Sequence, residues 1–308
     1  MTADSTRHAM SPGPDVVVVG AAARDIWPQD PRGWRLGGGV TYGALTLARL
    51  GIRTGVLIGV DQLARDAWEL DLLRDAGADV VTVPLEAGPV FNNEERPEGR
   101  VQTCLSRSDQ VPVHALPSAW RAAPAFLLAP VAAEVGMEWA AVPAHDACVV
   151  FGWQGILRHL FPGERVWPLD PTPSALVARA DLLGVSRHDL PHGLSLAVVA
   201  SWMRPESDLL LTAGDRGGVL LRVRGGRLVG GRVFPAIPPR VDLDPTGAGD
   251  TVLASVLAAR IAARSDAGRS GRELHLAAQA ASLLVERLAL DAVPTLKAVR
   301  ERMVDPAG

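Results

Sequence analysis

Lysine is almost absent from this chain, because Lys297 is the one lysine among 308 residues and arginine carries the remaining positive charge. A P-loop nucleotide site needs the lysine of its G-x-x-x-x-G-K-[ST] motif at the phosphates, so this class of NTPase is excluded. Any phosphate group that binds here must be held by backbone N–H groups, by arginine or by a metal ion. The formal net charge of -3 also gives no basic footprint for nucleic acid.

Cysteine and long apolar segments are scarce as well. Cys104 and Cys148 are the two cysteines, too few for a metal cluster or a disulfide scaffold, and we expect both to be reduced. No uninterrupted apolar run reaches the ~20 residues that span a membrane, and the N-terminus lacks the apolar centre of a signal peptide. We therefore expect a cytoplasmic protein with no membrane contact and a flexible tail at 1–13.

Strand-like and helix-like segments alternate along most of the chain. Apolar runs typical of buried strands lie at 15–20, 54–59, 79–83, 125–129, 147–151, 181–185 and 208–213. Helix-like stretches lie at 62–76, 131–141, 173–179 and 194–204, and three more follow at 249–263, 271–288 and 294–303. This alternation predicts a mainly parallel sheet covered on both faces, in one main domain over 14–308. Ligands of such sheets bind beyond the carboxyl ends of the strands.

A glycine-bearing turn precedes the helix-like segment at 249–263, and it reads Asp244-Pro-Thr-Gly-Ala-Gly-Asp250. Gly247 and Gly249 let the backbone fold tightly, while the following helix offers unpaired N–H groups and the positive end of its dipole to an anion. Asp250 stands beside these amides, where a carboxylate can accept a proton from an attacking hydroxyl. The alternative is that Asp250 only caps the helix, and the spacing alone leaves both interpretations open.

A second glycine-rich turn lies about two hundred residues earlier, at Gly37-Gly-Gly-Val-Thr-Tyr-Gly-Ala-Leu-Thr-Leu-Ala-Arg-Leu-Gly51. Its glycines allow close approach of the backbone to a small polar ligand, and apolar residues then recur near helical spacing. Gly51 sits where a left-handed helix end is expected. Taken alone, this stretch is a loop followed by a buried helix.

Together the two motifs resemble the signatures of the ribokinase-like (PfkB) family of sugar and nucleoside kinases. The C-terminal turn is similar to the family's D-T-x-G-A-G-D, with Pro245 in place of the usual threonine, and the N-terminal one to its diglycine turn and R-L-G helix. The resemblance implies a three-layer α/β/α fold with a mainly parallel central sheet and a small β lid. It also implies that Asp250 is the catalytic base and that the anion hole is formed by the amides of Gly247, Ala248 and Gly249.

The donor side carries weaker matches. The family's T-x-G-x-x-G turn, which carries nucleotide phosphates, is matched by Thr212, Gly214 and Gly217, although a plain hairpin has the same pattern. The resemblance implies ATP and Mg²⁺, with Thr246 also at the nucleotide, and leaves open whether a monovalent cation acts near Asp244. The family's N-x-x-E magnesium motif appears only as Ser186-Arg-His-Asp189, in which Asp189 keeps an oxygen ligand for an outer-sphere role.

The acceptor side departs further from the family. Asp25 sits where members carry an aspartate that binds two substrate hydroxyls, and the resemblance places Gly38 and Gly39 beside it. Tyr42, the one tyrosine, replaces the usual asparagine by a ring that can stack on an apolar sugar face or shorten the pocket. The small-molecule substrate is therefore a sugar, a cyclitol such as myo-inositol, or a nucleoside.

Two segments, near 24–37 and 88–107, break the alternation and read as short hairpins, with turn signals at Asn92-Asn93 and Pro97-Glu98-Gly99. The resemblance implies that they form a lid that excludes water from the substrate, and it allows a homodimer through that lid. The aromatic candidates to line the substrate or a partner subunit, with core packing as the alternative, are Trp27, Trp34 and Phe91.

The middle of the chain looks like a bacterial subgroup of the family related to inositol-kinase-like sequences. This resemblance lies in Phe126-Leu-Leu-Ala-Pro-Val131 with Glu134, and in a second stretch from Phe151 to Arg158. The residues of the second stretch that reach toward the active-site face in this interpretation are Trp153, Gln154 and Arg158.

The expected activity is transfer of the γ-phosphate of ATP to a hydroxyl of a small polyol. A nucleoside kinase is one alternative, and a non-catalytic module that senses nucleotide or sugar is another. Tyr42 and the altered magnesium motif favour the sensing module, whereas the intact Asp250 disfavours it. A dinucleotide oxidoreductase is disfavoured because no G-x-G-x-x-G follows the first strand-like run at Gly20.

Overall fold

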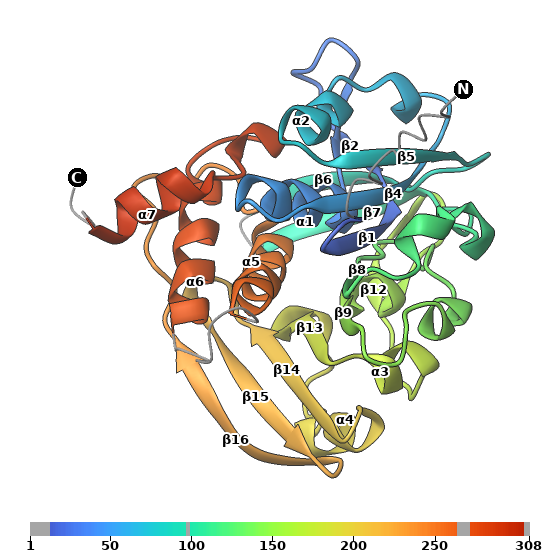
Figure 1. Cartoon of the computed structure of the whole chain (residues 1–308). Coiled ribbons are helices and arrows are strands. Elements are labelled where there is room, and N and C mark those ends of the chain that lie inside the picture. The colour runs from blue at the N-terminus through green and yellow to red at the C-terminus, as the bar shows by residue number, and fades with distance from the viewer. Residues whose placement is uncertain (1–12, 97–98, 264–271, 305–308) are drawn as a thin grey trace, which may run out of the picture.

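A nine-stranded sheet forms the middle layer of the structure (Figure 1). The structure is a computed structural model that describes residues 13–96, 99–263 and 272–304, so the tail expected at 1–13 lies outside it except for residue 13. The strand order is β16-β15-β14-β13-β9-β8-β1-β4-β5. Seven of these strands run parallel: β1 (Val16–Ala21), β4 (Thr54–Val60), β5 (Asp79–Pro84), β8 (Ala125–Leu128), β9 (Cys148–Gly152), β13 (Leu182–Ser186) and β14 (Glu206–Thr212).

Two antiparallel strands, β15 (Gly218–Arg224) and β16 (Arg227–Phe234), extend the sheet beyond β14. The seven strands expected at the apolar runs are confirmed, and so is the strand that follows the turn after β14. No apolar run marks β16 in the sequence, because this strand lies at the edge of the sheet and most of its side chains are exposed.

The central strands are buried on both faces, which accounts for their continuous apolar runs. Val16 and Val18 pack into one core, and Val17 and Val19 pack into a second core on the opposite face. The first core is covered by α1 (Gly39–Arg49), α2 (Glu69–Asp75), α5 (Ala248–Ala262), α6 (Arg272–Val285) and α7 (Leu296–Val304). The second is covered by α3 (Ala175–Arg179), α4 (Leu196–Trp202) and loops.

The helix expected at 131–141 is wrong, because only Met137–Ala141 forms a short 3₁₀ turn there. The Glu134 carboxylate accepts hydrogen bonds from the N–H groups of Val131 and Ala132, and Ala133 has a φ of 60°. Such local bonds compete with helical ones and hold the segment as a loop. The stretch expected as a helix at 62–76 is a 3₁₀ turn followed by α2. Other 3₁₀ turns are Val113–Ala115, Ser118–Trp120, Trp153–Ile156, Arg187–Asp189, Gly214–Arg216 and Leu290–Ala292.

The remaining expected helices are confirmed with end shifts of a few residues, as α3, α4, α5, α6 and α7. α1 ends as its sequence indicated, with Gly51 in the left-handed region at a φ of 87°. Among the residues that the structure describes, no helix combines the length and the apolar composition needed to cross a bilayer.

A smaller five-stranded sheet forms a lid over the carboxyl ends of the central strands. Its order is β11-β7-β6-β2-β3, with β2 (Ala23–Ile26), β3 (Trp34–Gly37), β6 (Val90–Arg96), β7 (Gly99–Ser106) and β11 (Glu164–Arg165). β10 (Arg158–His159) pairs with β12 (Trp167–Pro168) beside it. Both expected lid segments form strands, although Asn92 and Asn93 lie inside β6 and do not form the expected turn. The turn expected at Pro97-Glu98-Gly99 lies outside the described residues except for Gly99. The homodimer through this lid stays a prediction.

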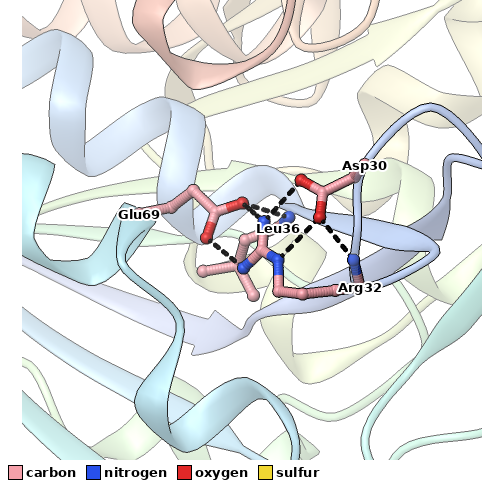
Figure 2. Close-up of polar contacts among 4 residues, drawn as sticks. All are labelled: Asp30, Arg32, Leu36 and Glu69. Carbon is pink, nitrogen blue, oxygen red and sulfur yellow. Dashed lines mark hydrogen bonds and ion pairs between the residues drawn. The ribbon is translucent and has the colours of Figure 1, made fainter.

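An ion-pair network fixes the β2–β3 hairpin to the first turn of α2, as Figure 2 shows. The Arg32 guanidinium donates to both oxygens of Asp30 at 3.0 and 2.9 Å and to both oxygens of Glu69 at 2.8 and 2.6 Å. Glu69 is 2 % exposed and also accepts the N–H of Leu36 at 3.1 Å. Arg32 lies over the Trp34 ring at 4.3 Å, so this tryptophan packs against arginine at the base of the lid.

Candidate active site

A cleft of about 1050 Å³ lies between the lid and the carboxyl ends of the central strands. The structure brings thirteen of the residues that the sequence assigned to the site to the lining of this cleft, from both glycine motifs, the lid and the β14–β15 turn. These residues are Asp25, Gly38, Gly39, Tyr42, Asp189, Thr212, Gly214, Gly217, Thr246, Gly247, Ala248, Gly249 and Asp250. These residues thus share one cleft. The role of each residue stays a prediction.

The turn before α5 is held in place by its own side chains and by glycine. Gly247 has a φ of 80°, a left-handed conformation that favours glycine, and its carbonyl accepts the N–H of Thr251 at 2.8 Å. The Asp244 carboxylate accepts the N–H of Thr246 at 3.0 Å. The N–H of Ala248 donates to the carbonyl of Pro245 at 3.1 Å. The expected anion hole therefore depends on the N–H groups of Gly247 and Gly249 more than on that of Ala248.

The two glycine motifs pack directly against one another. A Cβ atom on Gly39 would lie 3.0 Å from Oδ1 of Asp250, and one on Gly247 would overlap the ring of Tyr42. Tyr42 is 1 % exposed, and burial raises the pKa of its hydroxyl above the usual range. The Tyr42 ring therefore packs against Gly247 and supports the turn before α5. It presents little surface for the sugar stacking that the sequence suggested.

Asp250 lies at the N-terminal end of α5 with its carboxylate against Gly39. Burial raises its pKa from the usual 3.8 to about 6, with Arg158 acting to lower the pKa and Asp189 to raise it. A carboxyl group with such a pKa is ionised at neutral pH and can still accept a proton, which suits a general base. The alternative in which Asp250 caps the helix is not supported, because Gly247 occupies the cap position of α5 and Asp250 accepts no capping hydrogen bond among the described residues.

A polar group of the lid surrounds Asp25, which is 6 % exposed. Asn93 of β6 donates its Nδ2 to Oδ1 of Asp25 at 3.0 Å, and Gln102 of β7 donates its Nε2 to Oδ1 of Asn93 at 2.7 Å. Both amides line the cleft, so they present donors and acceptors to a polyol next to the carboxylate. Sequence reasoning missed both residues. The usable signal was the period of two in β6, which puts Asn93 on the same face as Phe91.

The aromatic candidates separate in the structure. Phe91 lines the cleft and is 2 % exposed. Trp27 lies against the Arg35 guanidinium at 4.1 Å, and Trp153 is fully buried in the core, so neither Trp27 nor Trp153 nor Trp34 belongs to the described lining. Gln154 and Arg158, in contrast, both face the cleft.

The β14–β15 turn, where the nucleotide phosphates are expected, forms part of the cleft lining. Gly214 and Gly217 have φ values of 61° and 79°, and the N–H of Ala213 donates to the carbonyl of Gly217 at 2.7 Å. The hairpin is confirmed, and its turn faces the α5 N-terminus across the cleft. The β16–α5 connection and α6 also contribute apolar residues to the lining, together with Asp242 and Ser282. We call the apolar residues Ile237, Pro238, Ala278, Ala281 and Val285 the apolar slot. Sequence reasoning did not find this slot, because its residues come from separate segments.

The residues present fit an outer-sphere magnesium role. Asp189 lines the cleft, and Nε2 of Gln154 lies 3.4 and 3.3 Å from its two oxygens. Within the described chain no three His, Cys, Asp or Glu side chains gather into a metal site. A single carboxylate is adequate for Mg²⁺ that takes its remaining ligands from phosphates and water.

The Asp244 carboxylate is paired with an arginine of the lid. Nη2 of Arg35 lies 2.6 Å from Oδ2 of Asp244, and both side chains are buried. A hydrogen bond from Thr246 and the charge of Arg35 hold the pKa of Asp244 below its usual value, against the effect of burial. A positive charge beside Asp244 is thus supplied by Arg35 of the lid strand β3, and the monovalent cation that the sequence left open near Asp244 stays a prediction.

No protein-family model matches the chain, and no curated protein matches it in sequence. Solved structures match it over almost its full length. A pyrophosphate-dependent kinase in the ribokinase family, solved with a pyrophosphate analogue and myo-inositol, is 18 % identical, with a TM-score of 0.73 and coverage of 93 % of this chain and 99 % of that chain.

Two further neighbours are a nucleoside kinase and a ribokinase. The Methanocaldococcus jannaschii nucleoside kinase is 17 % identical, with a TM-score of 0.67 over 95 % of this chain and 99 % of that chain. The Arabidopsis thaliana ribokinase, solved with ribose and ATP, is 20 % identical, with a TM-score of 0.65 over 94 % and 98 %. The layers, the lid and these likenesses together show that the chain has the ribokinase-like fold.

Proposed function

We propose that this protein is an ATP-dependent phosphotransferase that transfers the γ-phosphate of ATP to a hydroxyl of a small polyol, a sugar or a cyclitol. The observation that carries the proposal is that the Asp250 carboxylate and the glycine turn before α5 lie together in the lining of one cleft, which the lid strands also line. A base and an anion site side by side are what phosphoryl transfer to a hydroxyl requires.

The reaction follows from these positions. Asp25 and Asn93 hold the polyol so that one hydroxyl faces Asp250, which accepts the hydroxyl proton as the oxygen attacks the γ-phosphorus. The bond between the γ-phosphorus and the bridging oxygen breaks, and ADP leaves. The N–H groups of Gly247 and Gly249 hold the phosphoryl group in transit. Bound Mg²⁺, held by the donor phosphates and through water by Asp189, would offset the charge on those phosphates.

ATP fits the donor end better than pyrophosphate does. The apolar slot made by Ile237, Pro238, Ala278, Ala281 and Val285 offers contact area to an adenine ring, whereas pyrophosphate has no apolar part to bury there. The family of structural neighbours contains both kinds of enzyme, since one neighbour is named pyrophosphate-dependent and another was solved with ATP. The slot therefore supports the nucleotide donor.

A polyol fits the acceptor end better than a nucleoside does. Asp25, Asn93 and Gln102 offer carboxylate and amide groups to several hydroxyls at once. A nucleoside base stacks best on an open aromatic face. Trp27 and Trp34 are covered by arginines, and Phe91, which lines the cleft, is 2 % exposed and lies under Arg158. The sensing alternative is disfavoured because binding alone does not require a buried carboxylate such as Asp250 at the phosphate end.

The test is ADP release by purified protein with ATP and magnesium, across pentoses, hexoses, inositols, aminocyclitols and nucleosides, with pyrophosphate replacing ATP in a parallel series. An Asp250→Asn variant is the control. An acceptor-dependent signal with ATP that is lost in the variant supports the proposal. Nucleotide binding without turnover on any acceptor would support the sensing module, and turnover with pyrophosphate alone would overturn the donor assignment.

A further inference from the structure

Arg158 of β10 is the one permanently positive side chain among the described residues that line the cleft. The N-terminal lining, the β14–β15 turn and the α5 turn contribute carboxylates and amides but no lysine or arginine. A triphosphate brings several negative charges into a space that already holds Asp25, Asp189 and Asp250. The place of this single guanidinium therefore decides which part of the ligands receives a cationic contact from the protein.

The guanidinium of Arg158 is available to bind a ligand. In the described part of the chain it forms no ion pair or hydrogen bond with a protein group, and its one recorded partner is the Phe91 ring at 5.9 Å. Buried arginines normally pair with a carboxylate. Elsewhere in this protein the buried Arg35 and Arg302 do so. An arginine held over an aromatic ring and facing an open cleft is in position to bind an anion from solution.

Three carboxylates, those of Asp25, Asp189 and Asp250, line the cleft together with Arg158. Burial lowers the pKa of Arg158, and the charges of these three carboxylates act to raise it. Beside burial, the charges that shift the pKa of Asp250 are those of Arg158, which lowers it, and Asp189, which raises it. The guanidinium thus lies among the expected base, the expected magnesium-side carboxylate and the carboxylate that holds the acceptor. The group that passes between these three positions during the proposed reaction is the transferred phosphoryl.

We propose that Arg158 binds the γ-phosphoryl group of the donor and stabilises its charge during transfer. This inference rests on the proposed function and adds the cationic residue that it lacks. Guanidinium N–H groups match phosphate oxygens in pairs, and such charge-assisted bonds strengthen where water is excluded. The contact involves the terminal phosphoryl alone, because the remaining donor contacts lie at the β14–β15 turn and the apolar slot.

The test compares the binding of two nucleotides that differ by this one group, which makes the acceptor unnecessary. Calorimetry measures the affinity of ADP and of the unreactive β,γ-imido analogue of ATP, both with magnesium, for wild type and for Arg158→Gln. We expect the variant to bind the analogue about tenfold to a hundredfold more weakly, because this is the usual loss of affinity when a charged hydrogen bond is removed. The variant should bind ADP as wild type does. Arg158→Lys, which keeps the charge without the paired donors, should fall between the two.

Arg165→Gln is the matched control, since Arg165 lies in the same lid region, over Trp167 at 4.7 Å, and is exposed. It should bind both nucleotides as wild type does. Equal losses for ADP and the analogue in Arg158→Gln, or no loss for either, would overturn the inference alone. Wild-type protein that binds neither nucleotide would overturn the proposed function and the inference with it.

Discussion

Replacing Asp250 with asparagine is expected to remove most of the turnover and, at neutral pH, to stabilise the fold. The pKa of this carboxyl is raised from 3.8 to about 6 because folding buries it. A difference of about 2 units between the folded and unfolded pKa corresponds to about 3 kcal/mol of unfolding free energy. Asparagine has nearly the same shape and carries no charge, so it avoids this cost.

The sign of the pH dependence follows from the raised pKa. The folded protein holds the Asp250 proton more tightly than the unfolded chain does, so the carboxyl opposes folding increasingly from about pH 4 to about pH 6 and constantly above that. The stability gap between Asp250→Asn and wild type should therefore be about 3 kcal/mol at pH 7 to 8. It should shrink as the pH falls toward 5.

Urea unfolding at several pH values measures this gap. Asp146→Asn is a suitable control, because it removes one negative charge at an exposed position and should show no such pH dependence. In parallel, kcat/KM of wild type should fall as the pH drops through about 6, where the base becomes protonated, and the loss of the base should lower kcat by about 10²–10⁴-fold. An Asp250→Asn variant that is no more stable than wild type at pH 8 would refute the buried, high-pKa carboxylate.

Two further variants test the packing beneath the site. Gly247→Ala should cost about 3 kcal/mol or more, because it combines a left-handed φ with overlap on the Tyr42 ring, whereas Gly51→Ala, with a similar φ and open space, should cost about 1 kcal/mol in urea unfolding. Arg35→Gln should lower stability by about 3–5 kcal/mol, because it leaves the buried charge of Asp244 without its partner. Thermal melting of Arg35→Gln within a degree of wild type would show that the pair is solvated.

The sequence predicted the parallel strands well because their burial on both faces leaves a strong local signal in apolar runs such as Val16–Val19. It failed at 131–141, where composition favours a helix but the Glu134 carboxylate binds the local backbone. That outcome depends on Ala21 of β1 also donating to Glu134, a contact between residues far apart in the chain.

The site was predicted in its motifs and missed in its long-range contacts. The residues of the two glycine turns follow from local patterns, and the structure gathers them around one cleft. Asn93 and Gln102 were invisible because their relation to Asp25 depends on strand pairing in the lid. Tyr42 was interpreted as a ligand contact because its packing partner, Gly247, lies about two hundred residues further along the chain.

The contact between Tyr42 and Gly247 makes the two glycine motifs one module for protein engineering. A smaller residue imported at position 42 would leave a cavity beneath the α5 turn, and a larger residue imported at position 247 would collide with the ring. In a chimaera with a single crossover between positions 42 and 247, the two turns come from different proteins, and their contacting side chains need not fit together. Crossover points that lie before Gly37 or after Asp250 keep the module whole. A double crossover that replaces only β6 and β7 also keeps it whole, because both glycine turns then still come from the same parent.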